Sequence, residues 1–292
     1  MKTNLTLVIG PPKTGTTWLY HVIRTHPSFE MCPIKEIRFW DEFFKKKSVS
    51  LIERLKFRIG LLIIQKAHYR IFKNFPHNIF WILRYLMLDV HINFKSLKMY
   101  KKLISSKTDK WKLDISPQNY VLNEETIKTI SDNFKDVKIV MILRNPVERG
   151  LSHLNMSMGS YLQLMINNND YTYINTHLKK EIFEYNDYSS AYKKWSEYIP
   201  ASNIFIGYYD DIENNPEEFI SSLADFLAVS KEPFNRNTFK DIVNKSPDLI
   251  NSETINKLLM DDFKNKFDSY SKTFPDGISY FNTWKARYNI SS

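Results

Sequence analysis

A loop with the glycine spacing of a phosphate-binding loop lies close to the start of the chain. In "LVIGPPKTGTTWLYHVIRTHP", residues 7–27, Gly10 and Gly15 have the separation found in the nucleotide-binding sequence G-x-x-x-x-G-K-[ST]. Thr16 stands where that sequence has its lysine, and the lysine lies inside the loop at Lys13. Backbone N–H groups and threonine hydroxyls could still bind an anion where the next helix begins. The alternative is an ordinary glycine-containing turn capped by threonine.

A second set of polar residues follows an apolar run near the middle of the chain. The run "VKIVMIL", residues 137–143, is followed by Arg144, and Ser152 lies eight residues further on in a predicted helix. Nucleotide kinases place an acid at such a strand end to hold magnesium, whereas an arginine binds an anion directly. Two anion sites without a magnesium ligand suit a nucleotide with two separated phosphates, so we expect no metal. For Arg144 alone, the alternative is a surface ion pair.

A parallel sheet would bring these two sets together. Residues 5–26 read as strand, loop and helix, and helical spacing dominates 48–104. Strands and helices then alternate over 110–117, 125–134, 137–143, a helix starting at Pro146, 188–199, 203–209 and 216–229. This order predicts an α/β fold of the P-loop type, with three layers and a central parallel sheet flanked by helices. Ligands of such sheets bind at the carboxyl ends of the strands, where residues 10–17 and 144–152 both fall.

Length and composition are those of one globular domain. The chain has 292 residues, of which 43% are hydrophobic, enough for a single core, and we expect one domain over 1–292. The single cysteine, Cys32, excludes an intramolecular disulfide and suits a reducing compartment. The apolar runs are too short or too interrupted by charge for a signal peptide or a membrane span. We therefore expect a cytoplasmic protein.

The net charge of +9 is concentrated in one segment. Residues 45–112 contain seventeen Lys and Arg against three acids, a local charge of +14, and the rest of the chain carries −5. The asymmetry points to an anionic partner at this segment. Basic amphipathic helices also dock on membrane surfaces, and many are simply solvated. We expect no nucleic-acid partner, because the apolar residues here are too numerous and core-like for a stacking platform.

Several sequences resemble one enzyme family. "PKTGTTWL" (12–19) and "RNPVERGLSHL" (144–154) look like the 5′- and 3′-phosphate-binding motifs of sulfotransferases that use 3′-phosphoadenosine 5′-phosphosulfate (PAPS). "HPSFEMCPIKEIRFWD" and "LDISPQNY" resemble segments of the glycan-sulfating, heparan-sulfate-type branch. Residues 188–229 match the C-terminal helix–strand–helix of the family. The likeness covers roughly residues 1–40 and 110–230, and the two phosphate motifs stand in the expected order about 130 residues apart.

The resemblance implies in-line transfer of a sulfuryl group from PAPS, releasing adenosine 3′,5′-bisphosphate (PAP) without a metal. Lys13 and the loop N–H groups would neutralise the leaving 5′-phosphate. Arg144 and Ser152 would grip the 3′-phosphate. Trp18 either stacks on the adenine or belongs to the core, and both interpretations stay open. The residues expected to contact the nucleotide are Pro12, Lys13, Thr14, Gly15, Thr16, Thr17, Trp18, Arg144 and Ser152.

The acceptor hydroxyl must also lose a proton. By family position the general base is Glu36, and its alternative is a surface ion pair. The phenol- and steroid-sulfating branch uses a histidine after an "RLIKTH"-like segment that this chain lacks. Where the glycan branch has a lysine before Ser/Thr-Pro, this chain has Ile115, so Lys112 or Lys35 would have to supply that cation.

The basic segment 45–110 lies outside the resemblance and is expected to be a helical insertion near the acceptor site. Its charge suits a hydroxyl-bearing acceptor that is an acidic glycan, an anionic lipid head group or a phosphorylated metabolite. Two other classes remain. One is a P-loop nucleotide kinase or NTPase, which would need an acid after 137–143. The other is a basic protein that makes peripheral contact with membranes through 45–112.

Overall fold

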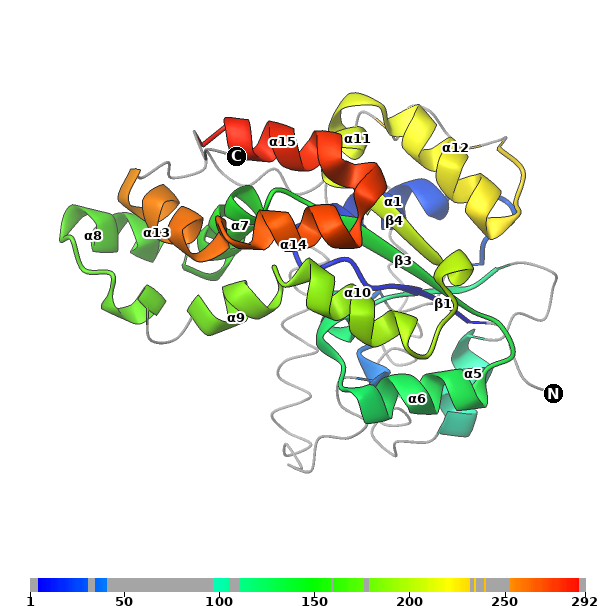
Figure 1. Cartoon of the computed structure of the whole chain (residues 1–292). Helices are drawn as coiled ribbons and strands as arrows, with labels where there is room; N and C mark the ends of the chain where they lie inside the picture. Colours follow the sequence, from blue (N-terminus) through cyan, green and yellow to red (C-terminus); the bar gives the residue numbers. More distant parts are fainter. Residues whose placement is uncertain are drawn as a thin grey trace.

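The computed structural model describes residues 5–30, 35–40, 97–104, 111–158, 160–175, 179–231, 234, 239 and 253–288. Its centre is a sheet with the strand order β2-β1-β3-β4, in which every neighbouring pair is parallel. The strands are β1 (Leu5–Val8), β2 (Leu113–Ile115), β3 (Val137–Leu143) and β4 (Ile204–Tyr208). The predicted α/β fold with a central parallel sheet is confirmed (Figure 1).

The central strand β3 supplies side chains to two hydrophobic cores, one on each face of the sheet. Ile139 and Met141 pack into the first core, and Val140 and Ile142 pack into the second. A strand covered by helices on both faces reads as a continuous apolar run, which is the pattern of residues 137–143.

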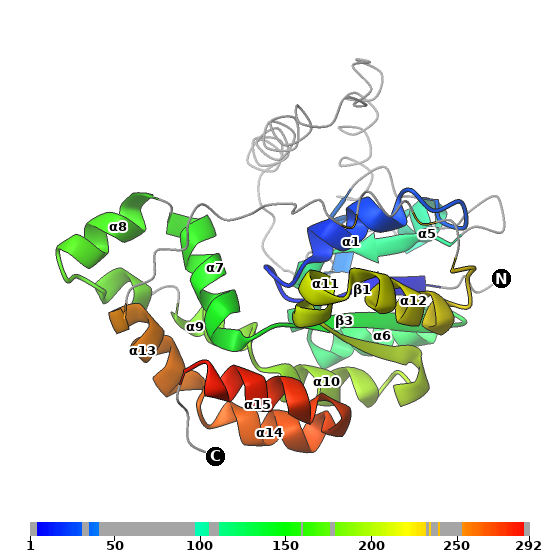
Figure 2. The same cartoon turned by 90° about the horizontal axis from the view of Figure 1, so that it is seen from above.

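Helices cover both faces of the sheet (Figures 1 and 2). The second core is closed by α1 (Thr16–Ile23), α11 (Tyr209–Asn214) and α12 (Pro216–Leu227). The first core is closed by α5 (Leu97–Ile104), α6 (Glu124–Asn133), α10 (Tyr188–Ser196), α14 (Lys266–Thr273) and α15 (Ile278–Ala286). Short 3₁₀ helices span Pro117–Val121, Ala201–Asn203 and Pro275–Gly277.

A group of helices lies beyond the carboxyl end of β3, on the left in Figure 1. It consists of α7 (Pro146–Met158), α8 (Ser160–Asn167), α9 (Lys179–Glu184) and α13 (Glu253–Phe263), which share a third core. The predicted start of α7 at Pro146 is confirmed, and the Asn145 side chain caps this helix by accepting a 3.0 Å hydrogen bond from the Val147 N–H.

The strand predicted over 110–117 differs from the structure. Only Leu113–Ile115 forms a strand, and Trp111 makes an isolated bridge with Phe29. Asp114 alternates with the apolar residues Leu113 and Ile115, which is the pattern of a polar face, yet Asp114 is fully buried. Its carboxylate accepts hydrogen bonds of 2.7 Å from the Tyr100 hydroxyl and 2.6 Å from the Ser116 hydroxyl. Asp114 can be buried in this edge strand because Tyr100 of helix α5 donates a hydrogen bond to its carboxylate.

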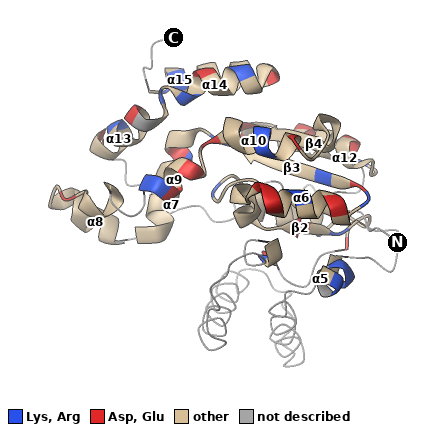
Figure 3. Cartoon of the chain, turned by 60° about the horizontal axis from the view of Figure 1, so that its bottom comes forward, with Lys and Arg blue, Asp and Glu red and all other residues tan. Residues whose placement is uncertain are grey.

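The prediction for the basic insertion can be compared with the structure only in part. Within 48–104, predicted as helical, α5 is described and confirms a helix over its own length. Residues 41–96, which include most of the segment 45–110, lie outside the described residues. Figure 3 shows that α5 carries several basic side chains.

Candidate active site

The loop between β1 and α1 is folded tightly on itself. The buried Thr14 hydroxyl donates a 2.8 Å hydrogen bond to the Pro11 carbonyl. Because its hydroxyl proton is used within the loop, Thr14 would contact a nucleotide through its backbone N–H. A side-chain carbon on Gly10 would lie only 2.7 Å from the Thr14 Oγ1. Helix α1 begins immediately after Gly15, and its first backbone N–H groups have no acceptor within the helix. N–H groups in this arrangement are suited to bind an anion at the carboxyl end of the sheet.

We predict that Gly15→Ala destabilises the protein by about 1–2 kcal/mol. Gly15 has φ +88°, which disfavours any side chain, and a Cβ there would lie 3.0 Å from the Ile212 Cδ1. Urea unfolding measures the change. Gly150→Ala is the matched control, because its Cβ would lie equally close to a neighbour, 3.1 Å from the Leu259 Cδ1, but at a helical position without positive φ. Equal losses in the two variants would contradict the role of the Gly15 backbone.

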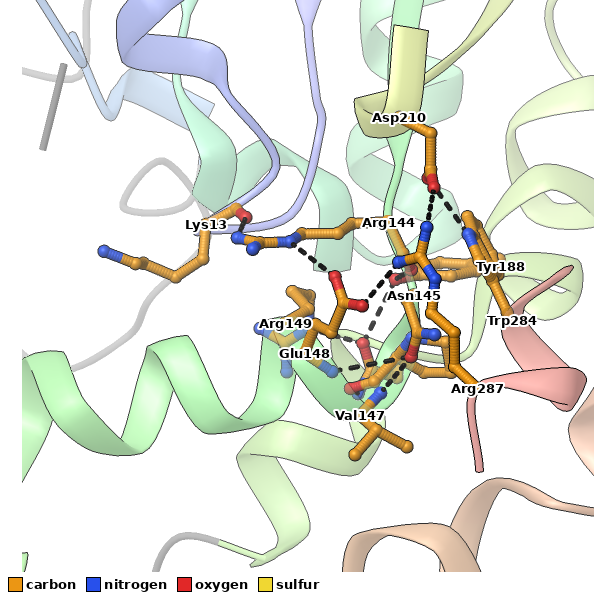
Figure 4. Close-up of polar contacts among 12 residues, drawn as sticks. Lys13, Arg144, Asn145, Val147, Glu148, Arg149, Tyr188, Asp210, Trp284 and Arg287 are labelled. Carbon is orange, nitrogen blue, oxygen red and sulfur yellow. Dashed lines mark hydrogen bonds and ion pairs between the residues drawn. The ribbon is translucent and has the colours of Figure 1, made fainter. Parts of the chain in front are cut away.

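Lys13 is held where the loop meets β3. Its backbone has φ +77°, a left-handed conformation that is strained for lysine, and its carbonyl accepts a 3.0 Å hydrogen bond from the Arg144 guanidinium (Figure 4). Burial lowers the pKa of the Lys13 ammonium, and the positive charges of Arg144 and Lys35 lower it further. The three cations repel one another, and an anion bound among them would relieve that repulsion.

Arg144 is fixed on three sides of its guanidinium. Besides its bond to the loop, its Cζ lies 4.0 Å from the centre of the Tyr209 ring, and its Nε lies 3.8 Å from a Glu148 carboxylate oxygen. The Tyr188 hydroxyl donates a 2.6 Å hydrogen bond to the Arg144 carbonyl, which fixes the end of β3 (Figure 4). The arginine is therefore oriented before any ligand binds, as tight phosphate binding requires.

Lys35 is the second cation at the loop. Its ammonium donates a 2.7 Å hydrogen bond to the Thr17 hydroxyl and lies near enough to Lys13 to lower the pKa of that lysine. Lys112 points elsewhere, because its Nζ lies 3.0 Å from a Glu30 carboxylate oxygen and 3.4 Å from the Leu103 carbonyl. Of the two candidates for the cation that Ile115 does not supply, Lys35 is therefore the one at the phosphate loop.

Glu36 follows this lysine on a strained segment. Its carboxylate lies 3.5 Å from the Lys35 ammonium and is partly exposed. Both Glu36, at φ +60°, and Arg38, at φ +57°, are left-handed, and such residues persist only where surrounding contacts hold them. One such contact is the 3.2 Å hydrogen bond from the Arg38 N–H to the Ser116 hydroxyl, which ties the segment to the end of β2. Strained backbone of this kind concentrates at functional sites.

Two further predicted nucleotide contacts are buried. Trp18 is only 5% exposed, its indole N–H donates a 3.2 Å hydrogen bond to the Phe239 carbonyl, and its ring packs edge-on against Phe219. These contacts place Trp18 in the second core, and its contact with adenine stays a prediction. Ser152 lies about two turns into α7 and is 3% exposed. Its contact with the 3′-phosphate also stays a prediction.

Arg149 is a site residue that sequence reasoning missed. It is fully buried and joins three segments: its Nε donates to the Asn186 amide oxygen, one Nη donates to the Ile182 carbonyl at 3.0 Å, and the other donates to the Pro12 carbonyl at 3.3 Å. Burial lowers the pKa of the guanidinium. The arginine fixes the phosphate loop against α7. The signal that could have found it was its place within the sequence RNPVERGLSHL, five residues after Arg144.

His153 is a second missed residue, and it predicts a pH dependence of stability. Burial, together with the positive charges of Arg149 and Lys13, lowers the pKa of its imidazole to about 4. The imidazole is therefore neutral at pH 7, and its 3.7 Å approach to Glu181 is not an ion pair.

The folded pKa lies below the unfolded value of 6.5, so folded protein binds fewer protons between pH 6.5 and 4. We expect His153 to make no pH-dependent contribution above 6.5 and to cost up to about 3 kcal/mol as the pH falls from 6.5 to 4. Urea unfolding of wild type and His153→Gln across this range measures the difference. Parallel stability curves for the two proteins would show that His153 does not titrate this way.

Two further properties concern only the part of the chain that the structure describes. No helix there is both long and apolar enough to cross a membrane. Within the same residues, no three His, Cys, Asp or Glu side chains gather as a metal ion would require.

The fold and the site together define an α/β protein of the P-loop type, whose anion site is built from cations and helix N–H groups. The sulfotransferase domain family matches residues 4–269, and the chain belongs to this family. This match confirms the sulfotransferase family predicted from the two phosphate motifs.

Solved structures with the same fold are distant in sequence. A sulfotransferase from Alicyclobacillus acidocaldarius superposes with a TM-score of 0.63 at 14% identity, covering 97% of this chain and 100% of that chain. The sulfotransferase domain from the curacin biosynthetic pathway superposes with a TM-score of 0.52 at 15% identity, covering 81% of this chain and 76% of that chain. None of the curated proteins matches the chain. At these identities the likeness establishes the fold.

Proposed function

We propose that this enzyme transfers a sulfuryl group from PAPS to an acceptor hydroxyl by in-line displacement and releases PAP. The observation that carries the proposal is the convergence of Lys13, Lys35 and Arg144 on the loop before α1, where burial and then the charges of the other two cations lower the pKa of Lys13. Such a cluster of positive charge suits a ligand with several negative groups. Membership of the sulfotransferase family supports the reaction type.

The 5′-phosphate side must stabilise the leaving group. The acceptor oxygen attacks sulfur while the bond from sulfur to the bridging oxygen of the 5′-phosphate breaks, and the bonding electron pair stays on that oxygen. Lys13 and the N–H groups of the α1 N-terminus would donate to the growing negative charge. Lys35, through its hydrogen bond to Thr17, stands beside them as the second cation.

The 3′-phosphate side must distinguish PAPS from other adenine nucleotides. Arg144 is already oriented by Lys13 and Tyr209, so it can bind a phosphate with little further loss of side-chain freedom. Ser152, on the helix that follows, would add a hydroxyl donor. A nucleotide kinase would need an acid here, which argues for a nucleotide with a 3′-phosphate rather than for magnesium-bound ATP.

Glu36 would accept the proton of the acceptor hydroxyl. Its carboxylate stands beside Lys35, the cation at the phosphate loop, on a strained segment that is tied to the end of β2 through Arg38. A carboxylate in this place can take the proton as the oxygen–sulfur bond forms. A glutamate base would agree with the resemblance of this segment to the glycan-sulfating branch of the family.

We predict that Glu36→Gln lowers kcat by about 10²–10⁴-fold and leaves the Kd of PAP nearly unchanged, because only proton transfer is removed. Turnover with PAPS and a hydroxyl acceptor found by screening measures kcat, and calorimetry measures Kd. Glu30→Gln is the matched control, since Glu30 is a nearby carboxylate that pairs with Lys112 instead of the loop lysines. A Glu36→Gln enzyme with wild-type kcat would exclude Glu36 as the base.

The acceptor carries a hydroxyl, and the charge of residues 45–112 favours an acidic glycan, an anionic lipid head group or a phosphorylated metabolite. Peripheral membrane contact through the same segment is the related possibility. Co-sedimentation with vesicles, with and without anionic lipid, separates the sources. Binding that does not depend on anionic lipid would exclude the membrane surface.

Thermal unfolding with PAP, with 5′-AMP and with ATP plus magnesium tests the nucleotide. A ligand at 100 times its Kd stabilises the folded state by about 2.7 kcal/mol, a shift of a few degrees for a protein of this size. Stabilisation by PAP at concentrations where 5′-AMP has little effect is the expected result. Stabilisation by ATP plus magnesium alone would favour a kinase and would overturn the roles of Arg144, Ser152 and Glu36.

A further inference from the structure

A carboxylate lies next to the arginine that is proposed to bind the 3′-phosphate. Glu148 is one turn after Arg144, and one of its carboxylate oxygens lies 3.8 Å from the Arg144 Nε. An acid in this place has two unfavourable effects on phosphate binding. It attracts the guanidinium toward itself, and its negative charge repels an incoming phosphate.

The last helix supplies a second arginine to the same carboxylate. The Arg287 Nη1 lies 2.5 Å from the other oxygen of Glu148, so the acid is held between two guanidinium groups (Figure 4). The shorter contact is the one to Arg287. Glu148 and Arg287 are 139 residues apart in the chain, so only the fold brings them together.

Arg287 is itself fixed at a second point. Its Nη2 donates a 2.9 Å hydrogen bond to one oxygen of Asp210, and the buried Trp284 indole donates a 2.9 Å bond to the other oxygen (Figure 4). The neighbouring acid Asp211 accepts a 2.7 Å hydrogen bond from the Tyr280 hydroxyl on α15. Helix α15 is therefore held against the start of α11, and Arg287 cannot move freely away from Glu148.

The four charged groups balance before a ligand binds. Arg144 and Arg287 carry two positive charges, and Glu148 and Asp210 carry two negative charges. Without Arg287 the other three of these groups would carry a net negative charge, and Arg144 would remain as the arginine beside Glu148. The side chain of Arg287 thus affects the phosphate site without any need to touch the ligand.

We propose that Arg287 is a positioning residue that sets the preference of the enzyme for a 3′-phosphorylated nucleotide. By binding Glu148 it compensates the negative charge of that acid and leaves the Arg144 guanidinium available to the 3′-phosphate. The inference rests on the proposed function, because it requires that Arg144 bind this phosphate.

Calorimetric titration of four proteins with PAP and with 5′-AMP tests the proposal. The proteins are wild type, Arg287→Met, Glu148→Gln and the double variant. We expect Arg287→Met to weaken PAP binding about tenfold, or about 1.4 kcal/mol, and to change 5′-AMP binding less than about twofold. Adding Glu148→Gln to Arg287→Met should restore most of the PAP affinity, because the uncompensated negative charge is then absent.

The outcomes separate this inference from the proposed function. Wild type that binds PAP and 5′-AMP equally would overturn both. Wild type that prefers PAP, together with an Arg287→Met variant that loses affinity for both nucleotides alike or for neither, would overturn the role of Arg287 alone. Arg287→Lys, which keeps the charge but loses the two-pronged geometry, should retain part of the preference and serves if Arg287→Met does not fold.

Discussion

Replacing Lys13 by alanine is expected to lower kcat by about 10²–10³-fold while changing the Kd of PAP far less. The reason is that negative charge on the 5′-phosphate grows only as the sulfur–oxygen bond breaks. Burial lowers the pKa of Lys13, and the nearby cations Arg144 and Lys35 lower it further. In the variant, Lys35 and the helix N–H groups would still bind the phosphate of the ground state. The variant would therefore lose stabilisation mainly of the transition state.

Three variants separate the charge of Lys13 from the shape of the loop. Lys13 has φ +77°, so alanine keeps the backbone strain whereas glycine relieves it. Lys13→Gly and Lys13→Ala should therefore lose kcat alike if the ammonium matters. Lys128→Ala removes an exposed lysine that pairs with Asp132 on α6, and it should keep wild-type turnover. Steady-state kinetics with PAPS measures kcat, and an unaffected kcat in Lys13→Ala would remove this lysine from the transition state.

The meeting of the two candidate phosphate-binding segments could be predicted from sequence because each segment is local. Each of its two halves is a short segment that directly follows an apolar strand, and parallel strands bring their carboxyl ends together. The hydrogen bond from Arg144 to the Lys13 carbonyl is the contact that this rule implies, across 131 residues of sequence. This contact could be expected without knowledge of the strand order or of the register between the strands.

The buried polar groups could not be predicted because their partners are distant in sequence. An arginine within a helix is normally exposed, and Arg149 is buried only because Asn186 and Ile182 accept its hydrogen bonds. The same is true of Asp114, whose burial depends on Tyr100 of α5. Hydrophobic alternation assigns such side chains to the solvent, since it carries no information about their partners.

The choice between Lys112 and Lys35 also depends on contacts that are distant in sequence. Lys112 was a candidate for the missing cation because it lies close in sequence to Ile115, yet it pairs with Glu30. Lys35 reaches the loop because the Arg38 N–H is bound to Ser116 at the end of β2, which places the segment 35–40 beside α1. A tertiary contact, and not proximity along the chain, therefore decides which lysine lies at the loop before α1.

Arg144→Ala is expected to weaken PAP binding by about 2–4 kcal/mol, which is roughly 30- to 1,000-fold in Kd. The variant removes the guanidinium that the Lys13 carbonyl and the Tyr209 ring hold in place, so the 3′-phosphate loses a charged partner in a partly desolvated site. The affinity for 5′-AMP should change much less, because that nucleotide has no 3′-phosphate. The quantity that isolates the role of Arg144 is therefore the ratio of the two dissociation constants.

This ratio also distinguishes the loss of a ligand contact from a disturbed loop. Because Arg144 binds the Lys13 carbonyl, its removal could loosen the loop and weaken both nucleotides together. Arg144→Lys keeps the positive charge but loses the paired donors that match a phosphate, so it should fall between wild type and Arg144→Ala for PAP. If Arg144→Ala weakens PAP and 5′-AMP by the same factor, the arginine supports the loop and does not read the 3′-phosphate. A loss of affinity for PAP alone would show that the Arg144 guanidinium binds the 3′-phosphate.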